Sequence, residues 1–144
     1  MTGYEKVFID TAPFIYFLDE NESFGDTVRE IFEEIINSEK SMISSVVTCE
    51  EYLVYPYKTD NHEKIDAFYE FTSDCGIELC PITNDIANKA AEIRARYESF
   101  KSMDALQLAV ATIRGCDVFL TNDRQLCQYS ELKCVTIEDW SVEI

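Results

Sequence analysis

The stretch from Lys101 to Asp123, KSMDALQLAVATIRGCDVFLTND, decides the fold of this chain. Nearly every residue between Asp104 and Ile113 is apolar or small. A helix that is apolar on almost every side is one that its domain encloses. Gly115 ends this helix, and Val118–Thr121 then forms a short, continuously apolar run. Such a run is typical of a strand that is buried on both faces of a parallel sheet.

Polar residues flank this unit and interrupt it at two places. Asp104 lies in the first turn of the predicted helix, and Asp123 follows directly after the strand. Only Gln107 and Thr112 interrupt the apolar pattern of the helix. Because ligands of open α/β sheets bind beyond the carboxyl ends of the strands, we expect the functional site at this edge.

The rest of the chain alternates between strand and helix patterns. Residues 24–38 have apolar side chains at helical spacing, whereas residues 56–62 are polar and aromatic and are expected to form a connecting segment. Short apolar runs predict strands near residues 6–9, 41–44, 77–80, 118–121 and 133–136. The alternation predicts one domain over residues 1–144, a three-layer α/β/α fold whose central, mainly parallel sheet has about five strands.

The charge balance is strongly acidic. The 144 residues include 28 Asp and Glu against 12 Lys and Arg, which gives a formal net charge of −16. Non-specific affinity for nucleic acid comes mainly from neutralisation of phosphates, so this surface repels nucleic acid at long range. It suits a basic protein partner, or it simply keeps the protein soluble.

The cysteines and the absence of long apolar runs indicate the compartment. Six cysteines contain no CxxC pair, and several lie within apolar runs, so we expect reduced, mostly buried thiols. No apolar run approaches the roughly 20 residues that span a bilayer, and we expect neither a signal peptide nor a membrane association. The prediction is a cytoplasmic protein. The single histidine, His62, lies in a polar segment, which argues against His-based catalysis or a His-rich zinc site.

Two further acidic positions lie at the ends of predicted elements. Asp10 follows the apolar run 6–9, with Thr11 as the expected helix cap, and it is either a metal-binding carboxylate or a turn residue. Glu50 and Glu51 lie in the first turns of the helix after the second strand. They project about 100° apart, so only one of them can face a given site. The helix macrodipole alone would also favour such a pair.

Carboxylates at these positions predict a divalent-cation site. Asp10, Asp104, Asp123 and one of the two glutamates all fall at a strand's carboxyl end or a helix's amino end, which share one edge of a parallel sheet. Four carboxylates together raise each other's pKa values unless a cation neutralises them. Oxygen ligands favour Mg²⁺ or Mn²⁺, and one use of such an ion is the hydrolysis of a phosphodiester.

Basic residues gather on one predicted helix. Lys89, Arg94 and Arg96 lie on one face of it, and Lys101 follows shortly after. They are either solvated helix charges or a local patch that faces a phosphate.

The order of these motifs resembles the PIN-domain family, in particular the toxin ribonucleases of VapBC-type toxin–antitoxin pairs. The resemblance rests on four motifs over essentially the whole chain: Asp10 after a strand, Ser45-x-x-Thr48-x-x-Glu51 opening a helix, Asp104-Ala-Leu opening an apolar helix, and Thr121-Asn122-Asp123 after a strand. It implies a PIN-like α/β/α fold and an endoribonuclease that depends on Mg²⁺ or Mn²⁺. It also implies an RNA substrate, a small antitoxin protein as partner and a homodimer.

The resemblance also assigns roles to residues. It implies that Asp10 and Asp104 are the principal metal ligands, that Glu51 rather than Glu50 holds the metal or its water, and that Asp123 completes the site. Together these four would be both the catalytic and the metal-binding residues. Thr11 and Thr121 would be polar neighbours that help to bind the substrate. The charge pattern of the chain, rather than the resemblance, adds Arg94, Arg96 and Lys101 as substrate-binding residues.

Two other functions compete with the nuclease. A phosphatase of the haloacid-dehalogenase type would use Asp10 as its nucleophile, but that family needs a second Asp two residues later, where this chain has Ala12. A non-catalytic PIN-like binding module is the other alternative, and the presence of all four acids argues against it.

Overall fold

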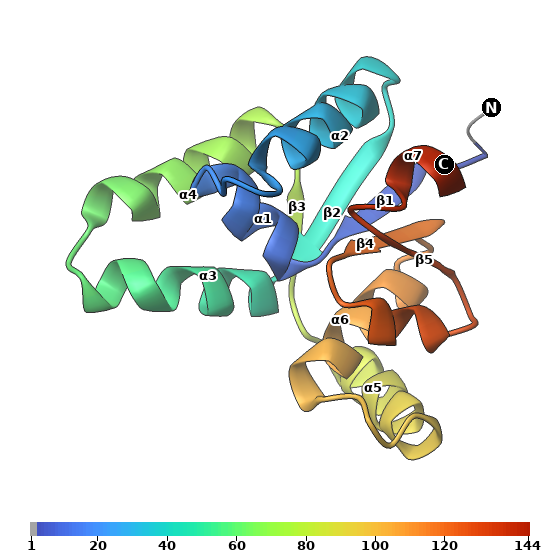
Figure 1. The fold of residues 1–144 in the computed structure, drawn as a ribbon. Coiled ribbons are helices and arrows are strands. Elements are labelled where there is room, and N and C mark those ends of the chain that lie inside the picture. The colour runs from blue at the N-terminus through green and yellow to red at the C-terminus, as the bar shows by residue number, and fades with distance from the viewer. Residues whose placement is uncertain (1–2) are drawn as a thin grey trace.

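A five-stranded parallel sheet forms the centre of the computed structural model, which describes residues 3–144 (Figure 1). The strand order is β3-β2-β1-β4-β5, and every neighbouring pair is parallel. The strands are β1 (Lys6–Ile9), β2 (Ser41–Ser45), β3 (Glu78–Cys80), β4 (Val118–Thr121) and β5 (Lys133–Thr136). The predicted α/β fold and its parallel sheet are confirmed.

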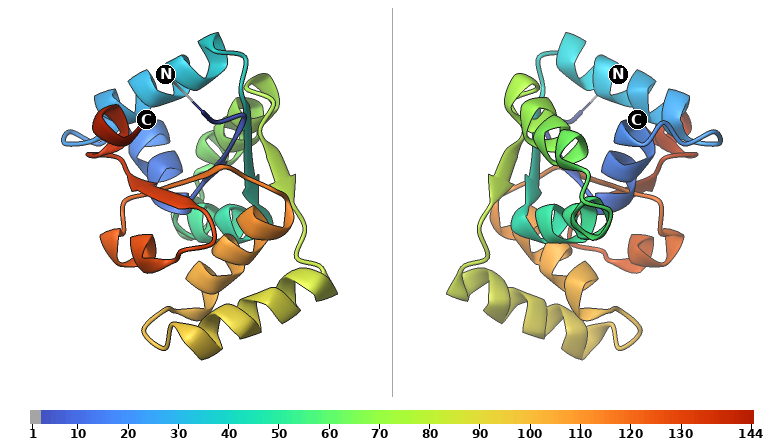
Figure 2. Two further views of the ribbon diagram at one scale, coloured as in Figure 1. Left: turned by 90° about the vertical axis from the view of Figure 1, so that its right-hand side faces the viewer. Right: turned by 90° about the vertical axis from the view of Figure 1, so that its left-hand side faces the viewer.

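Helices cover both faces of this sheet (Figure 2). They are α1 (Thr11–Leu18), α2 (Gly25–Asn37), α3 (Val46–Lys58), α4 (His62–Asp74), α5 (Asn84–Arg96), α6 (Ser102–Ile113) and α7 (Trp140–Glu143), with a 3₁₀ helix η1 (Arg124–Gln128). Helices α1 to α4 and α7 contribute to one hydrophobic core, and α5, α6 and η1 contribute to the other. The fold therefore has the three layers that the sequence predicts.

The two cores meet at the central strands because successive side chains of a strand point to opposite faces. Val7 and Ile9 of β1 belong to the core beneath α1 and α2, whereas Phe8 points to the core beneath α5 and α6. Phe8 stacks on Phe119 of β4, with ring centroids 5.1 Å apart. Both central strands are thus buried on both faces, as their continuous apolar sequences require.

One segment differs from its prediction. Residues 56–58 belong to α3, so the connection to α4 is only residues 59–61 and not the whole of residues 56–62. Pro56 lies within the last turn of α3 and is buried. Its burial holds that turn together even though proline has no backbone N–H to donate.

The parallel arrangement brings many element ends to one edge. All five strands end at this edge, and α1 and α3 begin there directly after β1 and β2. Helix α6 also begins there, since it runs back along the sheet before β4. The carboxyl edge of the sheet therefore collects the acidic residues that the sequence placed at element ends.

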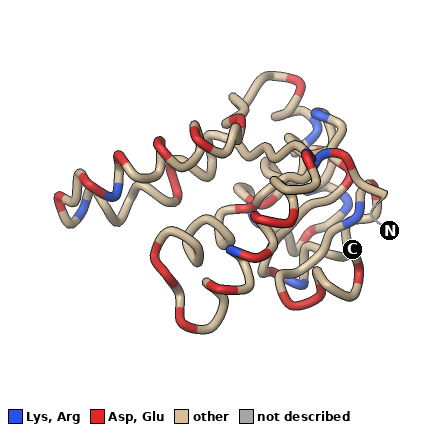
Figure 3. The backbone as a smooth tube through the Cα atoms, turned by 90° about the horizontal axis from the view of Figure 1, so that it is seen from above, with Lys and Arg blue, Asp and Glu red and all other residues tan. Residues whose placement is uncertain are grey.

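The described part of the chain also bears on the other predictions from composition. No helix within residues 3–144 is long and apolar enough to cross a membrane. All six cysteines are unpaired; two are buried and four are half-buried. Acidic residues are distributed along most of the backbone, with few basic residues between them (Figure 3).

Candidate active site

The four predicted carboxylates line one cavity of about 380 Å³ at the carboxyl edge of the sheet. Asp10 lies between β1 and α1, Glu51 on α3, Asp104 in the first turn of α6, and Asp123 between β4 and η1. The other lining residues are Thr11, Ala12, Ile15, Tyr16, Thr121 and Asn122. Residues separated by more than 110 positions in the sequence thus meet in one open cavity.

Asp10 is the buried member of the group, with 8% of its surface exposed. Its Oδ1 accepts a hydrogen bond from the backbone N–H of Thr11 (2.9 Å), and its Oδ2 accepts one from the hydroxyl of Thr121 (2.8 Å). Asp10 is therefore the N-cap of α1, and the prediction that Thr11 is the cap was wrong. The helix begins one residue earlier than expected, which makes Thr11 its first residue and leaves the Thr11 hydroxyl free for another contact.

Burial dominates the ionisation of Asp10. It raises the pKa of Asp10 from 3.8 to about 6, although the hydrogen bonds from Thr121 and Thr11 act in the opposite direction. The nearby charges of Asp104 and Glu51 raise the pKa further. A buried carboxylate with a raised pKa and like-charged neighbours is characteristic of functional sites.

Glu51 and Glu50 point to different parts of the surface. The hydroxyl of Thr11 donates a 2.6 Å hydrogen bond to Glu51 Oε1, which holds that carboxylate at the cavity with Asp10. Glu50 instead lines a separate cavity on the outer side of α3. Glu51 is therefore the glutamate that lies with the aspartates.

Asp104 and Asp123 complete the acidic wall. Asp104 is half-buried, and burial together with the charges of Asp123 and Glu51 raises its pKa, while Lys101 lowers it. Asp123 is exposed and caps η1, where its Oδ1 accepts from the backbone N–H of Gln125 (3.0 Å). Within residues 3–144 none of the four carboxylates forms an ion pair.

One buried residue beside the site, Gln107, was not among the predicted site residues. This residue is 1% exposed, and its Nε2 donates to Thr48 Oγ1 at 2.8 Å. The same nitrogen lies 3.4 Å from Asp10 Oδ1 and 3.4 Å from Thr11 Oγ1. A usable signal was present, because a buried polar side chain needs hydrogen-bond partners, and Gln107 lies three residues after Asp104 on the same helix face.

The predicted basic residues lie outside the cavity. Lys89 donates to Glu131 (2.8 Å) and Glu92 (3.2 Å), so acidic neighbours already neutralise its charge. Arg94 and Arg96 are exposed on α5 and do not line the cavity. Lys101 is close enough to Asp104 for its charge to lower the pKa of that carboxyl.

The donor set fits a hard divalent cation. All four side chains offer carboxylate oxygens. Their negative charges repel one another, and no ion pair within residues 3–144 neutralises them. No three acidic, His or Cys side chains within residues 3–144 are arranged to bind one ion together. Mg²⁺ needs no such cage, since it binds through one or two carboxylates and retains several waters.

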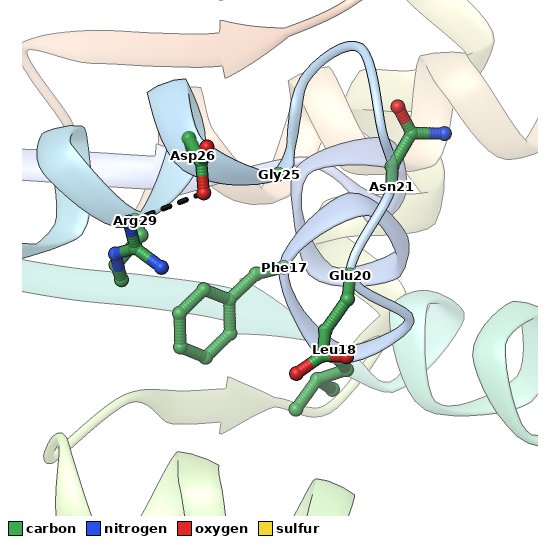
Figure 4. A pocket seen from close by; sticks show the side chains of 7 residues that line it. All are labelled: Phe17, Leu18, Glu20, Asn21, Gly25, Asp26 and Arg29. Atoms are coloured by element: carbon green, nitrogen blue, oxygen red, sulfur yellow. Dashed lines mark ion pairs between the residues drawn. The ribbon is translucent and has the colours of Figure 1, made fainter.

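Two larger cavities within residues 3–144 contain none of these four carboxylates. One of about 450 Å³ lies where α1 ends and α2 begins, lined by Phe17, Glu20 and the ion pair of Asp26 and Arg29 (3.1 Å), among others (Figure 4). A mostly apolar one of about 710 Å³ follows the outer side of α3. Neither contains any of the four clustered carboxylates.

The sequence profile of the family described as PIN domain matches residues 7–132. This chain belongs to the PIN-domain family. No curated protein matches its sequence closely enough to count as a relative. The assignment therefore rests on the family profile, on the fold and on the four motifs.

Solved structures share the PIN fold with this chain at low sequence identity. VapBC2 from Rickettsia felis, bound to a DNA fragment from its promoter, matches with a TM-score of 0.74 and 14% identity over 91% of this chain and 98% of that one. A toxin–antitoxin complex from Klebsiella pneumoniae gives 0.71 and 18% over 91% and 97%. VapC20 from Mycobacterium tuberculosis, a toxin that cleaves the sarcin–ricin loop, gives 0.66 and 16% over 88% and 98%.

Proposed function

We propose that this PIN domain is a Mg²⁺- or Mn²⁺-dependent endoribonuclease and the toxin of a VapBC-type toxin–antitoxin pair. The observation that carries the proposal is the convergence of Asp10, Glu51, Asp104 and Asp123 on one open cavity, where none of them forms an ion pair within residues 3–144. Membership of the PIN family and the likeness to toxin–antitoxin structures support it. The proposed setting is the cytoplasm, with a small antitoxin protein as partner and a homodimer as the assembly.

The carboxylates would hold the ion in unequal ways. Asp10 and Asp104 are the proposed principal ligands. Burial and like-charged neighbours raise the pKa values of both carboxyls, and a bound cation would stabilise their ionised forms. Glu51 and Asp123 are more exposed and would complete the site, directly or through water. When bound, the ion lowers the pKa of a water and stabilises charge on the phosphate oxygens.

The protein's own groups prepare the site for hydrolysis, in which water adds to phosphorus and one P–O bond breaks. Thr121 and the backbone of Thr11 hold the two oxygens of Asp10, so this carboxylate has a single orientation. The Thr11 hydroxyl holds one oxygen of Glu51 and leaves the other to accept a hydrogen bond from the attacking water. The open cavity admits an extended phosphodiester.

The charge distribution points to local recognition of RNA. A net charge of −16 opposes general binding to phosphates. Arg94, Arg96 and Lys101 are exposed near the end of α5 and the start of α6, and they are the proposed contacts for the RNA backbone. A structured RNA that places a phosphate on this small basic region while a loop enters the cavity fits this distribution.

Cleavage of total cellular RNA by the purified protein tests the proposal. We expect discrete fragments with Mn²⁺ or Mg²⁺, no cleavage with EDTA, and no cleavage by the Asp104→Asn variant. The Glu50→Gln variant is the matched control, because Glu50 is an exposed acid next to Glu51 that does not line the cavity. Overexpression should inhibit growth with the wild-type sequence and not with Asp104→Asn.

Other results would select the alternatives. An Asp104→Asn variant that cuts as well as the wild type would refute the proposed site. Intact RNA in every reaction, from protein that also fails to bind Mn²⁺, would favour a binding module. A phosphoaspartate trapped at Asp10 would favour the phosphatase, although Ala12 stands where that chemistry needs a second acid and both oxygens of Asp10 already accept hydrogen bonds.

A further inference from the structure

The amide of Gln107 has a defined orientation. Ser45 Oγ accepts a hydrogen bond from the backbone N–H of Val47 (3.1 Å), so the Ser45 hydroxyl is free to donate its hydrogen to Gln107 Oε1. This contact directs the carbonyl end of the amide toward the start of α3. The NH₂ end consequently faces Thr48 and Asp10.

A connected network of hydrogen bonds leads from this amide to Glu51. Gln107 Nε2 donates to Thr48 Oγ1 (2.8 Å), and the Thr48 and Thr11 hydroxyl oxygens are 3.2 Å apart. The Thr11 hydroxyl donates to Glu51 Oε1 (2.6 Å). Because a hydroxyl has one hydrogen, Thr11 can only accept in its contacts with Thr48 and Gln107. Thr48 Oγ1 also lies 2.8 Å from Ser44 Oγ, whose own hydrogen goes to the Ile9 carbonyl (2.7 Å). The contacts thus join Gln107 to Glu51 through Thr11, which Gln107 Nε2 also approaches directly at 3.4 Å.

The network spans three of the elements that carry the site, α1, α3 and α6. Gln107 is on α6, one turn after Asp104, whereas Thr11 begins α1 and Thr48 lies in the first turn of α3. These polar side chains are all buried, so they gain little from water and depend on one another. Gln107 is not among the residues that line the cavity, and it has no route to touch a substrate.

We infer that Gln107 is a positioning residue for the acidic site, which acts through Thr48 and Thr11 to hold Glu51 in the orientation that the bound ion or its water needs. The inference rests on the proposed metal-dependent nuclease function and adds to it a residue outside the four acids. Removal of a group that orients a metal ligand typically lowers metal affinity or activity by about 10–100-fold.

A double-mutant cycle between Gln107 and Glu51 tests the inference. Gln107→Met keeps an unbranched side chain of similar length but removes both polar ends. We expect it to lower Mn²⁺ affinity and kcat by about tenfold or more, with KM for RNA changed by less than about twofold. In the Glu51→Gln background the same substitution should have almost no further effect, because the group that Gln107 orients is already lost.

A control on the same helix separates positioning from packing. The Thr112 hydroxyl donates to the Leu108 carbonyl (2.8 Å) and lies away from the acids, so Thr112→Val removes one polar group from α6 and should keep both kcat and Mn²⁺ affinity. If Gln107→Met does not fold, Thr48→Val replaces it in the cycle, since it removes the hydroxyl that joins Gln107 to Thr11 and adds no charge.

The outcomes separate this inference from the proposed function. Equal losses from Gln107→Met in the wild-type and Glu51→Gln backgrounds would show a packing role and overturn the inference. Coupling in the Mn²⁺ titration with no RNA cleavage by any variant would support the positioning role and reject the nuclease. A wild-type protein that neither binds Mn²⁺ nor cleaves RNA would overturn both.

Discussion

Replacing Asp10 by Asn should make the metal-free protein more stable at pH 8, although it should abolish the proposed ribonuclease activity. Asp10 is 8% exposed, and burial raises its pKa from 3.8 to about 6. At pH 8 the folded protein must therefore keep a buried negative charge that the unfolded chain would hydrate. Asn has nearly the same shape and carries no charge, so the substitution relieves this cost.

The size of the effect follows from the shift in pKa. A pKa that is higher in the folded state contributes stability that is present below the unfolded pKa and is lost as the pH rises through the folded pKa. For Asp10 this interval runs from 3.8 to about 6. At about 1.4 kcal/mol per pKa unit, the free energy of unfolding of the wild type falls by about 3 kcal/mol over this interval, and the fall is complete above pH 7. Weaker pairing of Asn with Thr121 costs about 1 kcal/mol, which leaves a net gain of about 2 kcal/mol at pH 8.

Urea unfolding in EDTA measures this gain. Trp140 is the only tryptophan and is 3% exposed, so its fluorescence reports the unfolding of the core. We expect Asp10→Asn to be about 2 kcal/mol more stable than the wild type at pH 8 and under about 1 kcal/mol more stable at pH 5, where the folded wild type is largely protonated at Asp10. Asp66→Asn, at an exposed position of α4, should stay within about 0.5 kcal/mol of the wild type at both pH values. A variant that is less stable than the wild type at pH 8, or a gain that does not depend on pH, would refute the reasoning.

Three further predictions concern the acids, the basic patch and the core. Glu51→Gln should lower kcat by about tenfold or more and Glu50→Gln by less than about twofold in the same cleavage assay, and equal losses would reject the assignment of Glu51. Replacing both Arg94 and Arg96 by Glu should raise the KM for RNA and make that KM depend less on salt, as measured by cleavage at two salt concentrations. The affinity for Mn²⁺ should change little. An unchanged KM would show that RNA binds elsewhere on the protein. Phe119→Ala removes a fully buried ring that stacks on another phenylalanine, and it should cost about 3–5 kcal/mol in urea unfolding, whereas a cost under about 1 kcal/mol would contradict the described core.

Burial patterns made the fold predictable from the sequence. Residues 118–120 are apolar at consecutive positions because helices cover both faces of their strand, and the same holds for residues 7–9. Such runs are local signals, so all five strands and most helices could be located without structure. The acidic positions were equally accessible, since each of them follows a strand or opens a helix.

What local patterns could not show depends on contacts between distant residues. Pro56 reads as a helix breaker, yet tertiary burial keeps it within α3. The choice between Glu50 and Glu51 depends on a single hydrogen bond from Thr11, about 40 residues away in the sequence. Gln107 looks like an interruption of an apolar helix until Ser45 at the end of β2 and Thr48 of α3 are placed against it.

A measurement of Mn²⁺ binding shows whether Asp10, Glu51, Asp104 and Asp123 form one divalent-cation site. Titration of the wild-type protein, followed by the loss of the electron paramagnetic resonance signal of free Mn²⁺, should show saturable binding at pH 8. Asp10→Asn and Asp104→Asn should weaken this binding by at least about tenfold, and Glu50→Gln should leave it unchanged. Equal binding of Mn²⁺ by the wild type and Asp104→Asn would show that the four carboxylates do not form the cation site. The same conclusion would follow if neither protein bound Mn²⁺.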